Sequence, residues 1–126
     1  MQNNKITNRY LDDDADPASI IPEDVTGLGS AAFANYTALT CVIIPKRVMW
    51  IGRAVFAGCT GLTSVTIPKS VVEIDAYAFR GCTALTSIIY EGTQEEWDKI
   101  DKAERWHYGT PTITVHFEDG SCITIE

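Results

Sequence analysis

The sequence predicts an α/β solenoid, a short array of repeats with a parallel sheet on one face and helical or 3₁₀ turns on the other. Three observations predict it: a 23-residue period, a segment rich in β-branched residues in each period, and a second segment with apolar residues about three apart. At 126 residues, the chain is long enough for one domain. Its composition, 45% hydrophobic and 21% charged, is globular and excludes wholesale disorder.

Three copies of the 23-residue unit align without gaps at residues 20–91. Each copy has a proline, then aliphatic residues, a phenylalanine and a leucine at fixed distances. The aligned positions include Pro22, Pro45 and Pro68; Leu28, Ile51 and Ile74; Phe33, Phe56 and Phe79; Leu39, Leu62 and Leu85; and Val42, Val65 and Ile88. A unit this short buries its apolar face only against its neighbours, so the pattern indicates a stack of structural repeats.

The segments LTCVIIP, LTSVTIP and LTSIIYE predict the strands of the parallel sheet. Their β-branched residues suit a strand, and their apolar residues at the first, fourth and sixth positions are expected to point inward. By alternation, the outward face of the sheet carries Cys41, Ile43, Ser64, Thr66, Ser87 and Ile89.

The segments SAAFANYT, RAVFAGCT and AYAFRGCT follow a turn that carries inward aliphatic residues. Their apolar spacing predicts one helical or 3₁₀ turn in each copy. We expect Phe56 to be fully buried between Phe33 and Phe79. Trp50 falls next to the inward residue Ile51, so we expect its side chain to be exposed.

The unit IP..V..IG..AF..C..LTSVT resembles the BspA-like class of leucine-rich repeats, a family known chiefly from bacterial and protist surface proteins. Residues 45–67 match this pattern almost throughout, and YEGTQEEWDKI resembles the segment that often closes such arrays. The resemblance covers about residues 20–117. It departs at Tyr36, where cysteine is expected, and at Asp75, where glycine is expected. It also departs at residues 90–91, where the strand ends without proline.

A capping segment is expected after the last repeat, because a solenoid must cover its terminal apolar face. Thr93 and Glu96 form a T-x-x-E capping box, which predicts a helix over about residues 94–105. On such a helix Trp97 and Ile100 share one face, which we expect to contact the last repeat.

A β-hairpin around Asp119–Gly120 is predicted by the segment ITVHF-EDG-SCITIE. Both faces of this hairpin are partly apolar, and the pattern leaves open which one is buried. We therefore expect residues 92–126 to form a carboxyl-terminal cap of a helix plus a hairpin. Residues 1–19 are polar and are expected to form an amino-terminal tail or cap.

The four cysteines, Cys41, Cys59, Cys82 and Cys122, match no C-x-x-C metal or redox spacing. Cys59 and Cys82 occupy the same position of adjacent repeats, which favours packing in the core over a disulfide. Cys41 falls between two inward residues and is expected to face outward on the sheet.

The sequence predicts no metal site, cofactor or catalytic residue. Residues 12–23 carry acids at the spacing of a calcium-binding loop, but Pro17 stands where that loop requires glycine. His107 and His116 have no cysteine or carboxylate at ligand spacing. No G-x-S-x-G, H-E-x-x-H or phosphate-binding glycine motif occurs, so we expect no enzyme.

Ten basic and seventeen acidic residues give the chain a net charge of −7. This balance argues against a protein that coats nucleic acid, and no apolar stretch is long enough to insert into a bilayer. Residues 25–90 hold five basic and two acidic residues, whereas the flanks are strongly acidic. The acidic flanks favour a well-solvated surface, and the basic middle is compatible with an acidic partner.

The resemblance implies a non-catalytic binding module that contacts a protein partner, or weakly a second copy of itself, through the strand-lined face. Weaker candidates on the adjoining loops are Lys46, Arg47, Trp50 and Lys69. The alternative is a structural spacer or an end-capping fragment of a larger repeat protein. The resemblance also implies a place at the cell surface or secretion. No secretory signal is present in MQNNKITNRYLDDDAD, so the location stays open.

Overall fold

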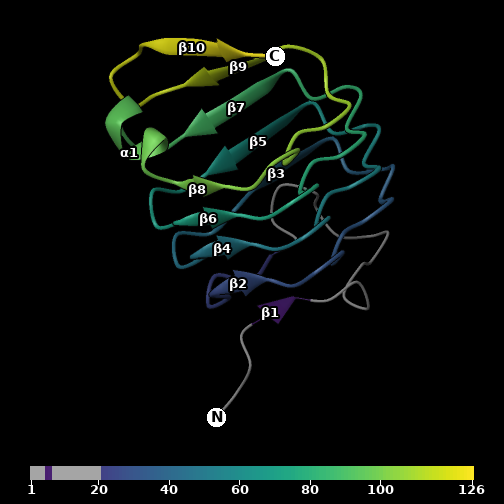
Figure 1. Ribbon diagram of the computed structural model, residues 1–126. Helices are drawn as coiled ribbons and strands as arrows, with labels where there is room; N and C mark the ends of the chain where they lie inside the picture. Colours follow the sequence, from purple (N-terminus) through teal and green to yellow (C-terminus); the bar gives the residue numbers. More distant parts are fainter. Residues whose placement is uncertain (1–4, 7–20) are drawn as a thin grey trace.

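The computed structural model describes residues 5–6 and 21–126, which wind into a β-solenoid of about four turns (Figure 1). Two five-stranded sheets line its opposite sides. Sheet A contains, in spatial order, β1 (Lys5–Ile6), β2 (Gly27–Leu28), β4 (Trp50–Ile51), β6 (Glu73–Ile74) and β8 (Asp101–Lys102). Sheet B contains β3 (Cys41–Ile43), β5 (Ser64–Ile67), β7 (Ser87–Tyr90), β9 (Ile113–His116) and β10 (Cys122–Ile125).

Sheet B confirms the predicted parallel sheet and its strand phase. In its register Val42 lies beside Val65, Val65 beside Ile88, and Ile88 beside Val115. All four side chains are buried. Equivalent positions of successive repeats therefore stack on one another, as the 23-residue period requires.

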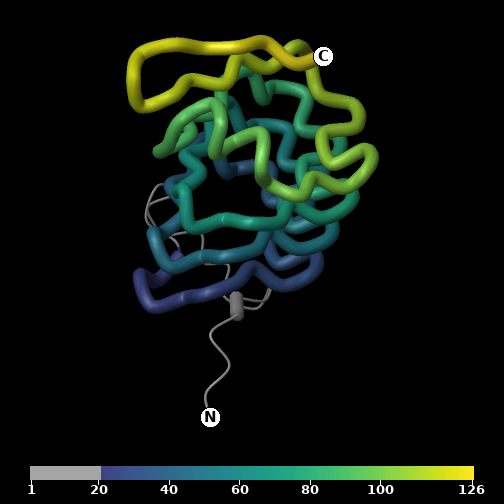
Figure 2. The backbone as a smooth tube through the Cα atoms, turned by 60° about the vertical axis from the view of Figure 1, so that its left-hand side comes forward, coloured from purple at the N-terminus to yellow at the C-terminus, as the bar shows by residue number. Residues whose placement is uncertain are grey.

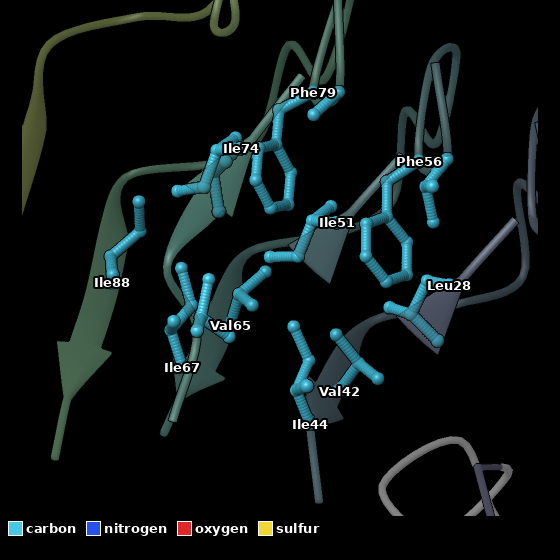
Figure 3. Close-up of a cluster of buried hydrophobic side chains, with 14 of the residues drawn as sticks. Leu28, Val42, Ile44, Ile51, Phe56, Val65, Ile67, Ile74, Phe79 and Ile88 are labelled. Atoms are coloured by element: carbon cyan, nitrogen blue, oxygen red, sulfur yellow. The ribbon is translucent and has the colours of Figure 1, made fainter. Parts of the chain in front are cut away.

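Sheet A was not expected as a separate sheet. Its strands are two residues long, and they hydrogen-bond in parallel from one coil to the next. In β2, β4 and β6 the side chains of Leu28, Ile51 and Ile74 point inward and face those of sheet B across the core (Figure 3). A strand of two residues shows no alternation, so its sequence carries no strand signal.

A phenylalanine ladder fills one end of this core, as predicted. The ring of Phe56 stacks on Phe33 with centroids 5.6 Å apart and on Phe79 with centroids 5.3 Å apart. Phe56 is fully buried. Trp106 then meets Phe79 edge-to-face at 6.0 Å and closes the ladder.

The segments predicted as helical or 3₁₀ turns are irregular turns instead, and they stack at the right of Figure 1. Two residues in each coil have left-handed backbone, which no helix tolerates. The first is at Ala31, Ala54, Tyr77 and Arg105, and the second is at Asn35, Gly58, Gly81 and Gly109. Backbone amides here bond to the next coil, as Phe56 N–H does to the carbonyl oxygen of Ala78 at 2.8 Å.

The helix of the carboxyl-terminal cap is shorter than predicted. Helix α1 spans Gln94–Asp98, and its predicted capping box is present, with the Thr93 hydroxyl accepting from the Glu96 amide at 3.1 Å. It does not reach residue 105, because the chain joins sheet A at β8. Trp97 and Ile100 are buried, as expected.

The last coil is lengthened around α1, and this places Lys102 at the inward position that Ile74 occupies in the preceding coil. The half-buried Lys102 ammonium donates hydrogen bonds to the carbonyl oxygens of Trp97 at 2.7 Å and Ile100 at 3.2 Å. It also lies 4.7 Å from the centroid of the Trp97 ring. The desolvation of this site lowers the pKa of Lys102.

In the segment predicted as a hairpin, β9 and β10 pair antiparallel around a turn that contains Gly120, whose φ is +88°. Ile113, Val115 and Phe117 point into the core, which settles the face that the sequence left open. The wound shape, with the hairpin over its carboxyl-terminal end, is clear in Figure 2. The predicted tail or cap of residues 1–19 lies outside the described residues except for β1.

Candidate binding face

The predicted site residues lie together on the outward side of sheet B, and we call this surface the outer face. It comprises Cys41, Ile43, Ser64, Thr66, Ser87 and Ile89 on strands β3, β5 and β7. They form two rows across the strands. One row is Cys41, Ser64 and Ser87, and the other is Ile43, Thr66 and Ile89.

Exposure differs along the second row. Ile43 is 51% exposed and Ile89 is 43% exposed, whereas Thr66 between them is half-buried. The neighbouring residues Ile44 and Ile88 are buried in the core. The two exposed isoleucines thus stand on either side of a hydroxyl, in an arrangement that offers apolar contact and hydrogen bonding together.

The outer face is wider than the sequence indicated, because β9 and β10 continue sheet B. Thr114 lies beside Ser87 and extends the hydroxyl row, while the exposed His116 lies beside Ile89. Cys122 pairs with His116 on β10. The alternation in ITVHF predicts that Thr114 and His116 face outward only if Ile113 and Val115 are known to be buried.

The loops at the carboxyl ends of the sheet B strands hold three of the four weaker candidates. Lys46 and Lys69 line a shallow cavity of about 470 Å³ together with Glu91. Arg47 and Lys46 line a neighbouring cavity with Glu23. These cations therefore share their surroundings with carboxylates and do not form a purely basic patch.

Trp50, the fourth weaker candidate, lies on sheet A and is half-buried rather than exposed. Its indole covers Gly27 of the adjacent strand, and a Cβ atom on Gly27 would collide with the ring. The side chain is therefore packed against backbone, which is a structural role. It does not join the outer face.

The buried thiols act as core groups. Cys59 Sγ donates to the carbonyl oxygen of Phe33 at 3.1 Å, and Cys82 Sγ donates to that of Phe56 at 3.0 Å. Both thiols are free, and burial raises the pKa of Cys59 to about 11 and that of Cys82 to about 12. They are therefore protonated and unreactive at neutral pH, as core packing predicts.

Chemically, the outer face offers hydroxyls, thiols and aliphatic side chains, with the imidazole of His116 as its one ring. No group of three metal-ligating side chains occurs within the described ranges 5–6 and 21–126. No helix in this part of the chain is long and apolar enough to cross a membrane. The arrangement is suited to contact with another surface.

The repeat pattern also matches a known family. The model of the BspA type leucine-rich repeat region matches residues 6–102, in six copies. The chain belongs to this family. The match confirms the resemblance that the repeat unit indicated, and the solenoid winding of the structure agrees with it.

Two solved structures are similar to this leucine-rich repeat protein. The pneumococcal vaccine antigen PcpA has a TM-score of 0.66 at 20% identity, over 77% of this chain and 23% of that one. A leucine-rich cell surface protein from Faecalibacterium prausnitzii A2-165 has a TM-score of 0.47 at 31% identity, over 64% and 27%. The chain thus spans about a quarter of each. No curated protein matches.

Proposed function

We propose that this leucine-rich repeat protein is a non-catalytic binding module whose protein partner contacts the outer face. The observation that carries the proposal is the exposure of Ile43 (51%) and Ile89 (43%) on either side of Thr66. A single exposed isoleucine is ordinary on a protein surface. Two in one row of a flat sheet, beside a row of hydroxyls, make a small apolar patch of the kind that marks interaction sites.

The geometry supports weak or bivalent binding. Strands are about 4.8 Å apart, so Ile43 and Ile89 are separated by about 10 Å across the central strand β5. A surface only about 10 Å wide offers less area than the roughly 800 Å² that each partner contributes to a stable complex. We therefore propose that a single copy binds weakly and that a tighter complex needs the added width of β9, or a second copy.

A structural role is the second candidate. The chain spans only 23% and 27% of the two similar solved structures, which are longer. A short array of the same repeat can serve as a spacer or as the end cap of a larger protein. We further propose a place at the cell surface, as the resemblance to BspA-like surface proteins implies.

The test is a comparison of two double variants in partner capture. Ile43→Glu with Ile89→Glu places two carboxylates on the outer face. Met49→Glu with Val72→Glu is the matched control, because these side chains are 48% and 58% exposed but lie outside sheet B. The binding role predicts that the first variant loses a partner that the wild type and the control both retain. Retention by all three proteins would favour the structural role.

A further inference from the structure

Three arginines and two tyrosines contact one another on the turn side of the solenoid, away from the outer face. Arg53 lies 5.2 Å and Arg80 lies 5.5 Å from the centroid of the Tyr77 ring. Tyr77 meets Tyr108 edge-to-face at 6.5 Å, and Arg105 lies 5.8 Å from the Tyr108 centroid. We call these five residues the arginine–tyrosine cluster.

Neighbouring coils show that the fold does not require these large side chains. The left-handed position of Tyr77 is filled by Ala31 and Ala54 in the two preceding coils. The position of Arg53 carries Ser30 in the preceding coil and Ala76 in the next, and that of Arg80 carries Ala34 and Ala57 in the two preceding coils. The same turn is therefore built with small residues elsewhere in this chain, and the cluster is an addition to the repeat.

Tyrosine rings hold the three guanidinium groups in place, and no carboxylate of the described residues neutralises their charge. Arg53, Arg80 and Arg105 are exposed, and among the described residues they contact tyrosine rings and form no ion pair with a carboxylate. A guanidinium held against a ring still presents N–H groups at its edge, and these N–H groups form bidentate hydrogen bonds with carboxylates. Since the rings fix the arginines beforehand, less side-chain entropy is lost when a ligand binds.

The cluster spans three successive coils. Arg53 follows β4, Arg80 follows β6 and Arg105 follows β8, so the positive charges are spread over about 10 Å along the solenoid axis. Several backbone amides of these turns bond to the next coil, as that of Ala54 does to the carbonyl oxygen of Ala76. The exposed arginine side chains supply donors for a ligand, and they suit an extended anion.

We propose that the arginine–tyrosine cluster binds a short acidic segment of a partner protein. The length of the ligand follows from charge: the cluster carries +3 within a chain of net charge −7. Exposed carboxylates of Glu73, Asp101 and Glu104 belong to the same coils and would repel a long, uniformly charged polyanion. A run of three or four carboxylates matches the charge of the cluster.

The probe is a fluorescently labelled peptide of four glutamates flanked by glycines, followed by anisotropy in 50 mM salt. The proposal predicts binding that weakens at least fivefold in 300 mM salt. Arg53→Ala, Arg80→Ala and Arg105→Ala together weaken binding at least tenfold. The matched control is Lys46→Ala, Arg47→Ala and Lys69→Ala, which removes the same charge from the opposite loops and changes the affinity by less than twofold.

A second pair of variants separates positioning from charge. Tyr77→Ala removes the ring that holds two arginines, and the fold tolerates it because Ala54 fills the same position. We expect at least threefold weaker binding for Tyr77→Ala and unchanged binding for Tyr77→Phe, which keeps the ring. Circular dichroism checks that each variant is folded.

Four results would overturn the proposal: no binding by the wild type, equal losses in both triple variants, tighter binding of a sulfated oligosaccharide than of the peptide, or self-association in sedimentation that the arginine triple variant abolishes. The last would make a second copy the occupant. The inference is independent of the role proposed for the outer face. Peptide binding that persists in Ile43→Glu with Ile89→Glu would show that the two sites are separate, and its loss there would contradict the placement of the cluster.

Discussion

The ring of Phe79 lies nearly parallel to that of Phe56, at an interplanar angle of 10° and a centroid distance of 5.3 Å. Phe33 continues the stack on the other side of Phe56 at 5.6 Å. Because each ring comes from a different coil, the ladder ties the coils together along the solenoid axis. The array is therefore expected to unfold as one cooperative unit.

The substitution Phe56→Ala tests the ladder. Phe56 is fully buried between two rings, so its loss leaves a cavity and removes both stacking contacts. We expect it to lower the free energy of unfolding by about 3–5 kcal/mol in urea melts. Met49→Ala, at a side chain that is 48% exposed, is the control and should cost less than about 0.5 kcal/mol. A loss below about 1 kcal/mol for Phe56→Ala would contradict the ladder.

The substitution Lys102→Ile puts an isoleucine at the position in the last coil that Ile74 occupies in the preceding coil. The repeat pattern alone would favour this change. The structure predicts a loss instead, because the carbonyl oxygens of Trp97 and Ile100 lose the Lys102 ammonium as their hydrogen-bond donor. We expect destabilisation of about 1–3 kcal/mol by thermal or chemical unfolding. An unchanged or higher stability would show that the ammonium contributes nothing to the cap.

Gly27 and Trp50 form a tight pair, since a Cβ atom on Gly27 would collide with the indole. Gly27→Ala should therefore displace the ring and cost about 1–3 kcal/mol by overpacking. In a Trp50→Ala background the same substitution should cost less than about 0.5 kcal/mol, because the obstructing ring is gone. Equal costs in both backgrounds would rule out the contact as the cause.

Because of the buried thiols, we expect the free energy of unfolding to depend on pH in the alkaline range. Burial raises the pKa of Cys59 from 9.0 to about 11 and that of Cys82 to about 12. Above pH 9 the unfolded chain loses these protons first, so the stability contributed by the two thiols falls as the pH rises toward their folded-state values. The slope is about 1.4 kcal/mol per thiol for each pH unit.

The comparison protein for this dependence is Cys59→Ala with Cys82→Ala, in which we expect a shallower decline between pH 9 and 11. Parallel declines in the variant and the wild type would assign the effect to other groups. At neutral pH, reducing agent should leave the melting temperature unchanged, because the described cysteines are free.

The 23-residue period was enough to predict the stacking of the coils and the strand phase of sheet B. It placed Phe56 in the core and Ile43 on the surface, because burial in a stacked repeat is dictated by the position within the unit. The capping box could also be predicted, since Thr93 and Glu96 satisfy backbone donors through purely local contacts. The hairpin followed from Asp119–Gly120.

Features that depend on tertiary context were missed. The left-handed backbone at Ala54 and Tyr77 has no glycine to signal it, and hydrogen bonds between coils hold it in place. The helix expected to reach residue 105 ends at Asp98, because pairing of β8 with β6 competes with helix propensity and wins. The arginine–tyrosine cluster assembles residues from three coils, and only the register of the turns brings them together.

The measurement that most directly tests the role of the outer face is the affinity of a captured partner for Ile43→Glu with Ile89→Glu, by titration calorimetry. We expect the variant to keep wild-type circular dichroism and stability, since both side chains point away from the core. We expect its affinity to fall at least tenfold, about 1.4 kcal/mol, while Met49→Glu with Val72→Glu binds as the wild type does. A folded variant that binds with unchanged affinity would contradict the assignment of the outer face as the binding site.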